Sequence, residues 1–147
     1  MRYTIKKAHA DVLKMCGQND LHVTIEDNKI VMDPTSLILP VNWRDWLIGL
    51  KFTALVNQEG KCICGEQLRD EGELHHALVT KADLSGYRDD AKNKILHHTY
   101  NVVLCHQRCH TGLVRRRCLV FLRELYGEKV IAWYENIPAK SFMRRTM

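Results

Sequence analysis

The pattern of apolar and polar positions predicts two kinds of element in the first forty or so residues. Residues 4–16 repeat apolar side chains at helical spacing, and Gly17 follows where such a helix would end. Residues 21–32 instead alternate apolar and polar side chains around the turn-forming pair Asp27-Asn28. This second stretch predicts a β-hairpin. We expect residues 1–41 to form an N-terminal appendage made of this helix and hairpin, without catalytic residues.

From residue 42 onwards the pattern predicts helices separated by short strands. Asn42 is suited to cap a helix that runs from Trp43 to about Asn57. The later predicted elements are strands over 73–79 and 102–104 and helices over 106–126 and 128–136. Residues 80–100 are largely polar, which predicts a long loop of the kind that is often functional or mobile. The sequence therefore predicts an α+β fold, with residues 42–147 as one domain.

Four cysteines fall in two close pairs that lie about forty residues apart. One pair is in Cys62-Ile63-Cys64-Gly65 and the other in Cys105-His106-Gln107-Arg108-Cys109. Two such pairs predict a four-thiolate zinc site that pins two separate elements together and contributes to folding. Neither pair has the usual Cys-x2-Cys spacing, and His106 could replace one thiolate. Buried structural cysteines or a chance disulfide explain this clustering beside turns less well.

The histidines gather in the same region, since six of the eight lie between positions 75 and 110. Imidazole titrates near neutral pH and binds divalent metals when it is neutral. Phosphodiester hydrolysis needs both a base that deprotonates water and a cation that absorbs charge. Adjacent residues on a strand point to opposite faces, so His75 and His76 are expected to have different roles. One can face a metal while the other faces water.

In its order of motifs the chain resembles the HNH endonucleases, also called ββα-metal or His-Me finger nucleases. A cysteine pair comes first, then His75-His76 at a strand end, then Asn101-Val102-Val103-Leu104-Cys105, and finally Cys109-His110 at a helix. The resemblance covers about residues 43–136. It implies a ββα-metal core with a structural zinc at Cys62, Cys64, Cys105 and Cys109, and with flanking helices.

The same resemblance assigns roles to individual residues. It implies that His76 is the general base and that Asn101 fixes the loop that orients this base. It also implies that His75 and His110 hold one catalytic divalent cation, which can be Mg²⁺, Mn²⁺, Ni²⁺ or Zn²⁺. Colicin-type nucleases are similar at His-His but carry a further histidine at the position of Val114. A third ligand here would therefore be water, phosphate or a loop residue.

We accordingly expect a metal-dependent DNA endonuclease that nicks DNA or cuts both strands, of a small stand-alone phage or mobile-element type. One alternative is a zinc-stabilised nucleic-acid-binding module without catalysis, which would need the cysteines and arginines but neither His76 nor His110. A second alternative is a nuclease that acts on RNA or branched DNA. The neighbouring doublet His97-His98 is expected to belong to the loop between the strands.

The charge of the chain is compatible with binding to DNA. The formal net charge is +5, and arginines crowd the C-terminal half. We expect Arg108, Arg115, Arg116 and Arg117 to hold phosphates, which positions a duplex without reading its sequence. Three consecutive helix positions cannot all face one groove, so a solvated face is the alternative for part of this set.

The sequence also suggests a compartment. Residues 1–16 contain no uninterrupted apolar stretch, so we expect no secretory signal. The longest apolar runs are too short to span a bilayer, and no membrane partner is expected. We expect a cytoplasmic protein, in the host cytoplasm if a phage encodes it, where thiols stay reduced and bind metal.

Overall fold

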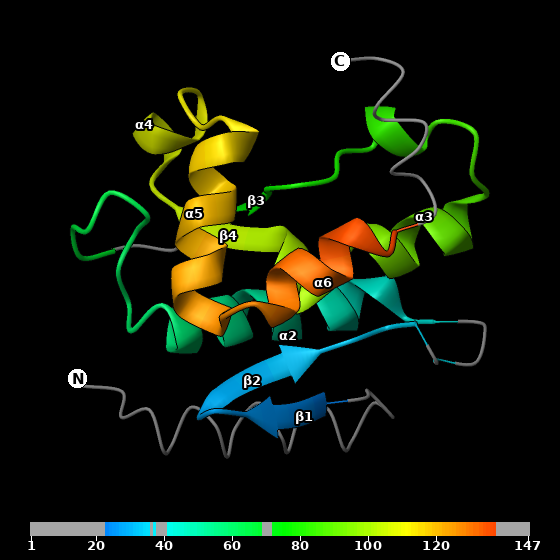
Figure 1. Cartoon of the computed structure of the whole chain (residues 1–147), viewed down its shortest axis with the longest axis horizontal. Coiled ribbons are helices and arrows are strands. Elements are labelled where there is room, and N and C mark those ends of the chain that lie inside the picture. Colours follow the sequence, from blue (N-terminus) through cyan, green and yellow to red (C-terminus); the bar gives the residue numbers. More distant parts are fainter. Residues whose placement is uncertain (1–22, 36, 38–40, 69–71, 138–147) are drawn as a thin grey trace.

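The computed structural model describes residues 23–35, 37, 41–68 and 72–137, and it shows a mixed α+β chain (Figure 1). Its elements are β1 Val23–Glu26, β2 Lys29–Met32, α2 Trp43–Asn57, β3 Glu73–His76, α3 Asp89–Leu96, β4 Val102–Cys105, α4 Gln107–His110, α5 Arg115–Tyr126 and α6 Lys129–Glu135. Two short 3₁₀ helices, η1 Ala82–Leu84 and η2 Thr99–Asn101, flank α3. The helix predicted over residues 4–16 lies outside the described residues.

The described strands form two separate antiparallel pairs. β1 and β2 make the predicted hairpin, and its turn residues Asp27 and Asn28 both have positive φ. β3 and β4 are joined by the long segment 77–101, and in their register His76 lies opposite Val102. A side chain on β3 therefore shares a face with the side chain opposite it on β4.

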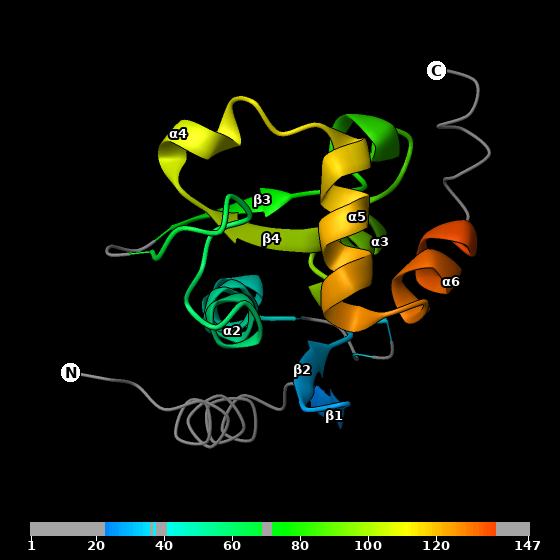
Figure 2. The ribbon, with the colours of Figure 1, turned by 60° about the vertical axis from the view of Figure 1, so that its left-hand side comes forward.

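Helix α2 packs between the two strand pairs (Figure 2). Asn42 caps it as predicted, because its side chain accepts a hydrogen bond from the Asp45 backbone N–H at 3.2 Å. The fully buried Trp46 and Leu50 of α2 belong to one apolar cluster with Met32 of β2 and Val102 of β4. The hairpin predicted as part of an appendage thus contributes directly to the core.

Strand β4 is covered on both faces. Val102 packs toward α2, whereas Val103 belongs to the cluster that contains Cys118 and Leu122 of α5. Burial on both faces explains why this strand is apolar throughout rather than alternating. Cys118 is a core residue, as predicted, and its pKa is raised by burial.

Two predicted segments differ from the structure. Residues 106–126 form two helices, because the chain leaves α4 after His110 and Val114 is extended at the start of α5. Gly112 in this break disfavours a continuous helix, while Leu113 turns inward to pack on the core. The described helices include none that is long and apolar enough to cross a membrane.

The loop prediction for residues 80–100 is wrong, because α3 lies within this segment. The first turn of α3 contains Asp89 and Asp90 and its last turn contains Lys94. These charges favour helix formation through their interaction with the helix dipole. Leu96 is the residue of α3 that is fully buried, so the helix carries almost no apolar periodicity for the sequence to reveal.

Asn57 joins the hairpin to the rest of the fold, and its replacement provides a test of that packing. Its buried side chain accepts from the Ile30 N–H at 2.9 Å and donates to the Ile30 carbonyl at 2.8 Å and to the Tyr126 hydroxyl at 2.9 Å. We expect Asn57→Ala to lower the free energy of unfolding by about 2–4 kcal/mol, because buried backbone groups lose their partner. Urea denaturation measures this. Asn93→Ala, the same change within α3, should alter stability by less than about 0.5 kcal/mol, and equal effects of the two variants would contradict the role of Asn57.

Candidate functional site

Three cysteines and one histidine converge on a candidate metal centre. The ligand atoms of Cys62, Cys64, His106 and Cys109 all lie within 4.8 Å of one another. Tetrahedral zinc bound at about 2.3 Å from sulfur separates its ligands by about 4 Å. This donor set therefore fits zinc in both chemistry and spacing.

The turn after α2 orients the first two thiols. Gly65 adopts a positive φ of 91° and donates its N–H to the Cys62 carbonyl at 2.9 Å, which closes the turn. The backbone N–H groups of Cys64 and His106 point at the Cys62 sulfur at 3.5 and 3.4 Å. These two contacts fix the position of the Cys62 sulfur within the cluster.

Cys105 does not belong to this group, so the predicted set of four cysteines is revised. It is fully buried at the end of β4, and its thiol donates to the Glu73 carbonyl at 3.6 Å. The next residue, His106, lies outside the strand, and its Nδ1 is 3.6 Å from the Cys64 sulfur. Its Nε2 lies 3.1 Å from the Gln67 carbonyl, which suits Nε2–H as a donor and leaves Nδ1 as the ligand atom.

The electrostatics of the thiols agree with this assignment. A hydrogen bond from the Glu66 backbone lowers the pKa of Cys64 to about 7, whereas burial and the neighbouring Cys62 and Cys64 raise the pKa of Cys109 to about 11. A divalent cation would allow these crowded sulfurs to be thiolates together. Burial raises the pKa of Cys105 to about 12, which keeps this core thiol protonated.

On one face of β3, two predicted ligands of the catalytic cation come together. The rings of His75 and His110 have centroids 4.7 Å apart and are nearly perpendicular. Glu73 lies two residues before His75, and its Oε2 is 2.7 Å from His110 Nδ1. This contact orients the ring and leaves His110 Nε2 able to bind a metal, an arrangement common in metal sites. The sequence prediction missed Glu73, although its i, i+2 spacing on the strand places it on the face of His75.

This histidine pair would need further ligands to hold a cation. Within the described ranges, the cluster around Cys62 is the group that brings three or more metal-ligating side chains together. At His75 and His110, water or substrate oxygens would have to complete the coordination of a cation. Burial, followed by the charge of His110, lowers the pKa of His75 and so favours the neutral imidazole that a metal requires.

On the opposite face of the same strand, His76 contacts His97. The Nε2 of His76 lies 3.2 Å from the Nδ1 of His97, within hydrogen-bond distance. Burial lowers the pKa of both rings to about 4, with the nearby charges of Lys81 and of the neighbouring histidines as further causes. His76 is therefore neutral at pH 7, which is the form that a general base requires. The sequence prediction missed this partner, because His97 lies 21 positions from His76 and no local pattern pairs the two rings.

The two histidines of the 97–98 doublet lie in the connection between the strands, as expected, and both are buried. His97 packs against Trp43 with ring centroids 5.5 Å apart. His98 lies between Tyr100 and Trp133 and accepts the Tyr100 N–H through its Nδ1 at 3.0 Å. Its Nε2 is 3.7 Å from Asp33, which ties η2 to the segment after β2.

Asn101 braces the segment that follows His76. Its fully buried side chain accepts the N–H groups of Leu78 and Val79 at 3.0 and 2.8 Å. It donates to the carbonyls of Val79 and Leu96 at 2.9 and 3.1 Å. One amide thus fixes both the backbone after β3 and the end of α3, and a role of Asn101 in orienting a catalytic base stays a prediction.

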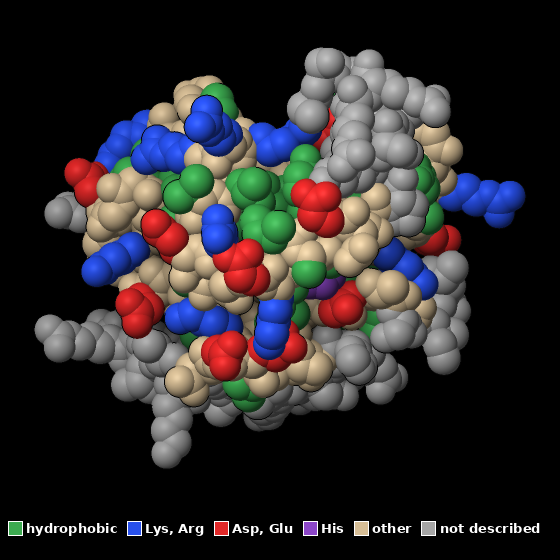
Figure 3. All heavy atoms as spheres, in the orientation of Figure 1, with side chains coloured by type: hydrophobic (Ala, Val, Ile, Leu, Met, Phe, Trp, Pro, Cys, Tyr) green, Lys and Arg blue, Asp and Glu red, His purple; other side chains and the backbone are tan. Residues whose placement is uncertain are grey.

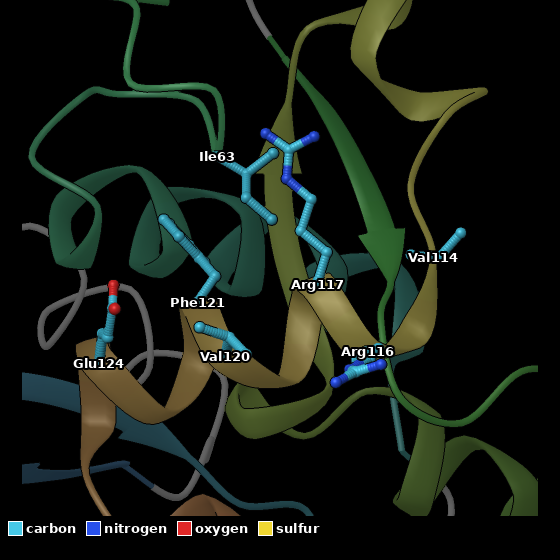
Figure 4. A pocket seen from close by; sticks show the side chains of 7 residues that line it. All are labelled: Ile63, Val114, Arg116, Arg117, Val120, Phe121 and Glu124. Atoms are coloured by element: carbon cyan, nitrogen blue, oxygen red, sulfur yellow. The ribbon is translucent and has the colours of Figure 1, made fainter.

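The four arginines predicted to bind DNA fall into two groups. Arg108 forms an exposed ion pair with Glu66, and Arg115 binds Asp83 of η1 at 2.9 Å. The other two arginines border a hollow on α5, which is lined by Ile63, Val114, Arg116, Arg117, Val120, Phe121 and Glu124 (Figure 4). DNA contact by these four residues remains a prediction.

No family model, curated protein or solved structure matches the chain. The resemblance to HNH endonucleases therefore depends on the sequence motifs of this chain alone. What the structure establishes is an α+β protein with a Cys/His cluster suited to a metal such as zinc.

The revised ligand set leads to a direct test by metal content. We expect about one zinc per chain in the dialysed protein, and we expect Cys105→Ala to keep it because Cys105 is a core residue. His106→Ala should lose most of the zinc, whereas His106→Cys should retain it by restoring a fourth good ligand. Elemental analysis and X-ray absorption, which distinguishes three sulfurs from four, measure the outcome. Zinc loss in Cys105→Ala together with full retention in His106→Ala would restore the original four-cysteine assignment.

Proposed function

We propose that this protein is a metal-dependent DNA endonuclease of the HNH type. The observation that carries the proposal is the division of two adjacent histidines at the end of β3. His75 faces His110, which suits a cation site, while His76 faces His97, which suits a base. A non-catalytic module that binds nucleic acid has no need of either pair.

His75 and His110 would hold the cation through neutral imidazole nitrogens. The bound cation would stabilise the negative charge that develops on the phosphate and on the leaving oxygen. Glu73 would keep the ring of His110 oriented and its Nε2 available. A substrate phosphate would have to lie across the end of β3, within reach of both His75 and His76.

His76 would act as the general base through Nδ1. For Nδ1 to accept a proton from water, Nε2 must carry the hydrogen of the neutral ring. His97 Nδ1, at 3.2 Å, is placed to accept that hydrogen and so to select this form of His76. When Nδ1 takes the proton from water, the contact with His97 would also stabilise the resulting imidazolium. His97 is buried, so it would act as a positioning residue through His76.

The Cys62 cluster has a separate, structural role in this proposal. A zinc there would connect the turn after α2 to the segment that leads into α4, and α4 presents His110. The same cluster would equally stabilise a module that binds nucleic acid without cutting it. Catalysis by the histidines is therefore the property that an experiment must test.

Cleavage of supercoiled plasmid tests the proposal most directly. We expect nicking or linearisation with at least one of Mg²⁺, Mn²⁺, Ni²⁺ and Zn²⁺. His76→Ala should lower the rate by about 10²–10⁴-fold, and added metal should not restore it, because the missing group is a proton acceptor. His75→Ala and His110→Ala should weaken metal binding, so a higher metal concentration should recover part of the activity.

Two controls make this outcome interpretable. Zinc content and the circular dichroism spectrum should be unchanged in the three variants, which separates catalysis from folding. Parallel reactions with RNA and with branched DNA identify the preferred substrate. DNA binding without cleavage under every metal would favour the binding module instead, and full activity in His76→Ala would remove His76 as the base.

A pair of substitutions at His97 tests the positioning role. His97→Phe keeps a ring against Trp43 but removes the acceptor, and we expect it to lower kcat on the order of 10²-fold with little change in KM. His97→Asn keeps an acceptor near the position of Nδ1 and should recover much of the loss. Single-turnover kinetics and metal titration measure both variants. Equal activity of His97→Phe and the wild type would show that His76 works without this contact.

A further inference from the structure

One face of α5 exposes apolar and charged side chains together. Val120 and Phe121 lie three and four residues after Arg117, and Glu124 lies four and three residues after them, so the four side chains share one side of the helix. Val120 is 55% exposed, both charged residues are exposed, and Phe121 is only partly buried. With Ile63 beside them they line a hollow of about 450 Å³ (Figure 4). Hydrophobic side chains gather over α5 among charges of both signs (Figure 3).

The stability of α5 itself does not explain these charges. A helix favours acidic residues in its first turn and basic residues in its last turn. Here Arg116 and Arg117 lie in the first turn, which contains no acidic residue, and Glu124 lies near the end. Arg115 differs from the other two because it binds Asp83. The order of Arg117 and Glu124 therefore suits a second helix that runs in the opposite direction.

We propose that this face is the interface through which two copies of the chain pair, with their α5 helices antiparallel about a two-fold axis. Because α5 spans Arg115–Tyr126, its midpoint falls between Val120 and Phe121. An antiparallel pair centred there sets Val120 against the partner's Phe121 and Arg117 against the partner's Glu124. The two-fold axis repeats each contact, so two ion pairs flank an apolar centre.

A second copy fits this face better than DNA does. Glu124 would repel phosphates, whereas an exposed valine and a partly exposed phenylalanine at the centre of a charged rim are typical of a protein interface. One helix of this length provides a small contact area, so the dimer should be weak and concentration-dependent. The proposal is independent of the nuclease activity. Arg116 points away from Arg117 and remains outside the central pairs (Figure 4).

Sedimentation equilibrium of the full chain over a range of concentrations tests the pairing. The wild type should show a reversible monomer–dimer equilibrium. Arg117→Glu and Glu124→Arg should each raise the dissociation constant about tenfold or more, because each places like charges opposite one another twice. The double variant Arg117→Glu/Glu124→Arg should dimerise like the wild type. Arg116→Glu, with the same charge change one residue away, should leave the constant within about twofold.

Mixing the two single variants gives the sharpest result. Arg117→Glu has two acidic side chains on this face and Glu124→Arg has two basic ones, so an equimolar mixture should form heterodimers more tightly than either variant pairs with itself. A wild type that remains monomeric at its highest soluble concentration would overturn the proposal. So would a dimer that neither single variant weakens, or one that the double variant and the mixture fail to restore.

Discussion

The buried amide of Asn101 is the contact on which the histidine site depends. Its oxygen holds the backbone of residues 78 and 79, and its nitrogen holds the carbonyl at the end of α3. The first of these contacts fixes where the chain goes after His76, and the second fixes where His97 begins. A side chain with one acceptor and two donors can hold two segments at once, which a hydroxyl or a carboxylate could not do in the same way.

Next to Asn101, the alternation of side chains along β3 places different functional groups on the two faces of this strand. β3 sends Glu73 and His75 to the face where α4 presents His110, and it sends His76 to the face where Trp43 and His97 lie. Both faces are supported from outside the strand. Trp46 of α2 donates to the His97 carbonyl at 2.7 Å, and α5 packs on Val103 of β4. The packing of α2 and α5 on the two sides of the strand pair therefore supports the histidine site.

The candidate zinc centre and the histidine site are linked through the end of β4. His106 follows Cys105 directly, so the position at which the strand ends decides which of the two side chains faces the candidate metal centre and which enters the core. Within one short helix, α4 places Cys109 in the candidate metal centre and His110 against Glu73. Loss of the metal should thus disturb the orientation of His110 as well as the local fold.

Several features follow from the sequence by itself, because local physical chemistry determines them. The cap at Asn42, the turn at Asp27-Asn28, the opposed directions of His75 and His76 and the pairing of the cysteine segments each depend on neighbouring residues or on a simple period. The tertiary structure alone decided the rest. The burial of the hairpin, the contact of His97 with His76 and the choice of His106 over Cys105 depend on residues brought together from distant positions. The sequence did not predict α3 because this helix buries only one leucine fully and so has no apolar period. Its local signal is limited to the charges at its two ends.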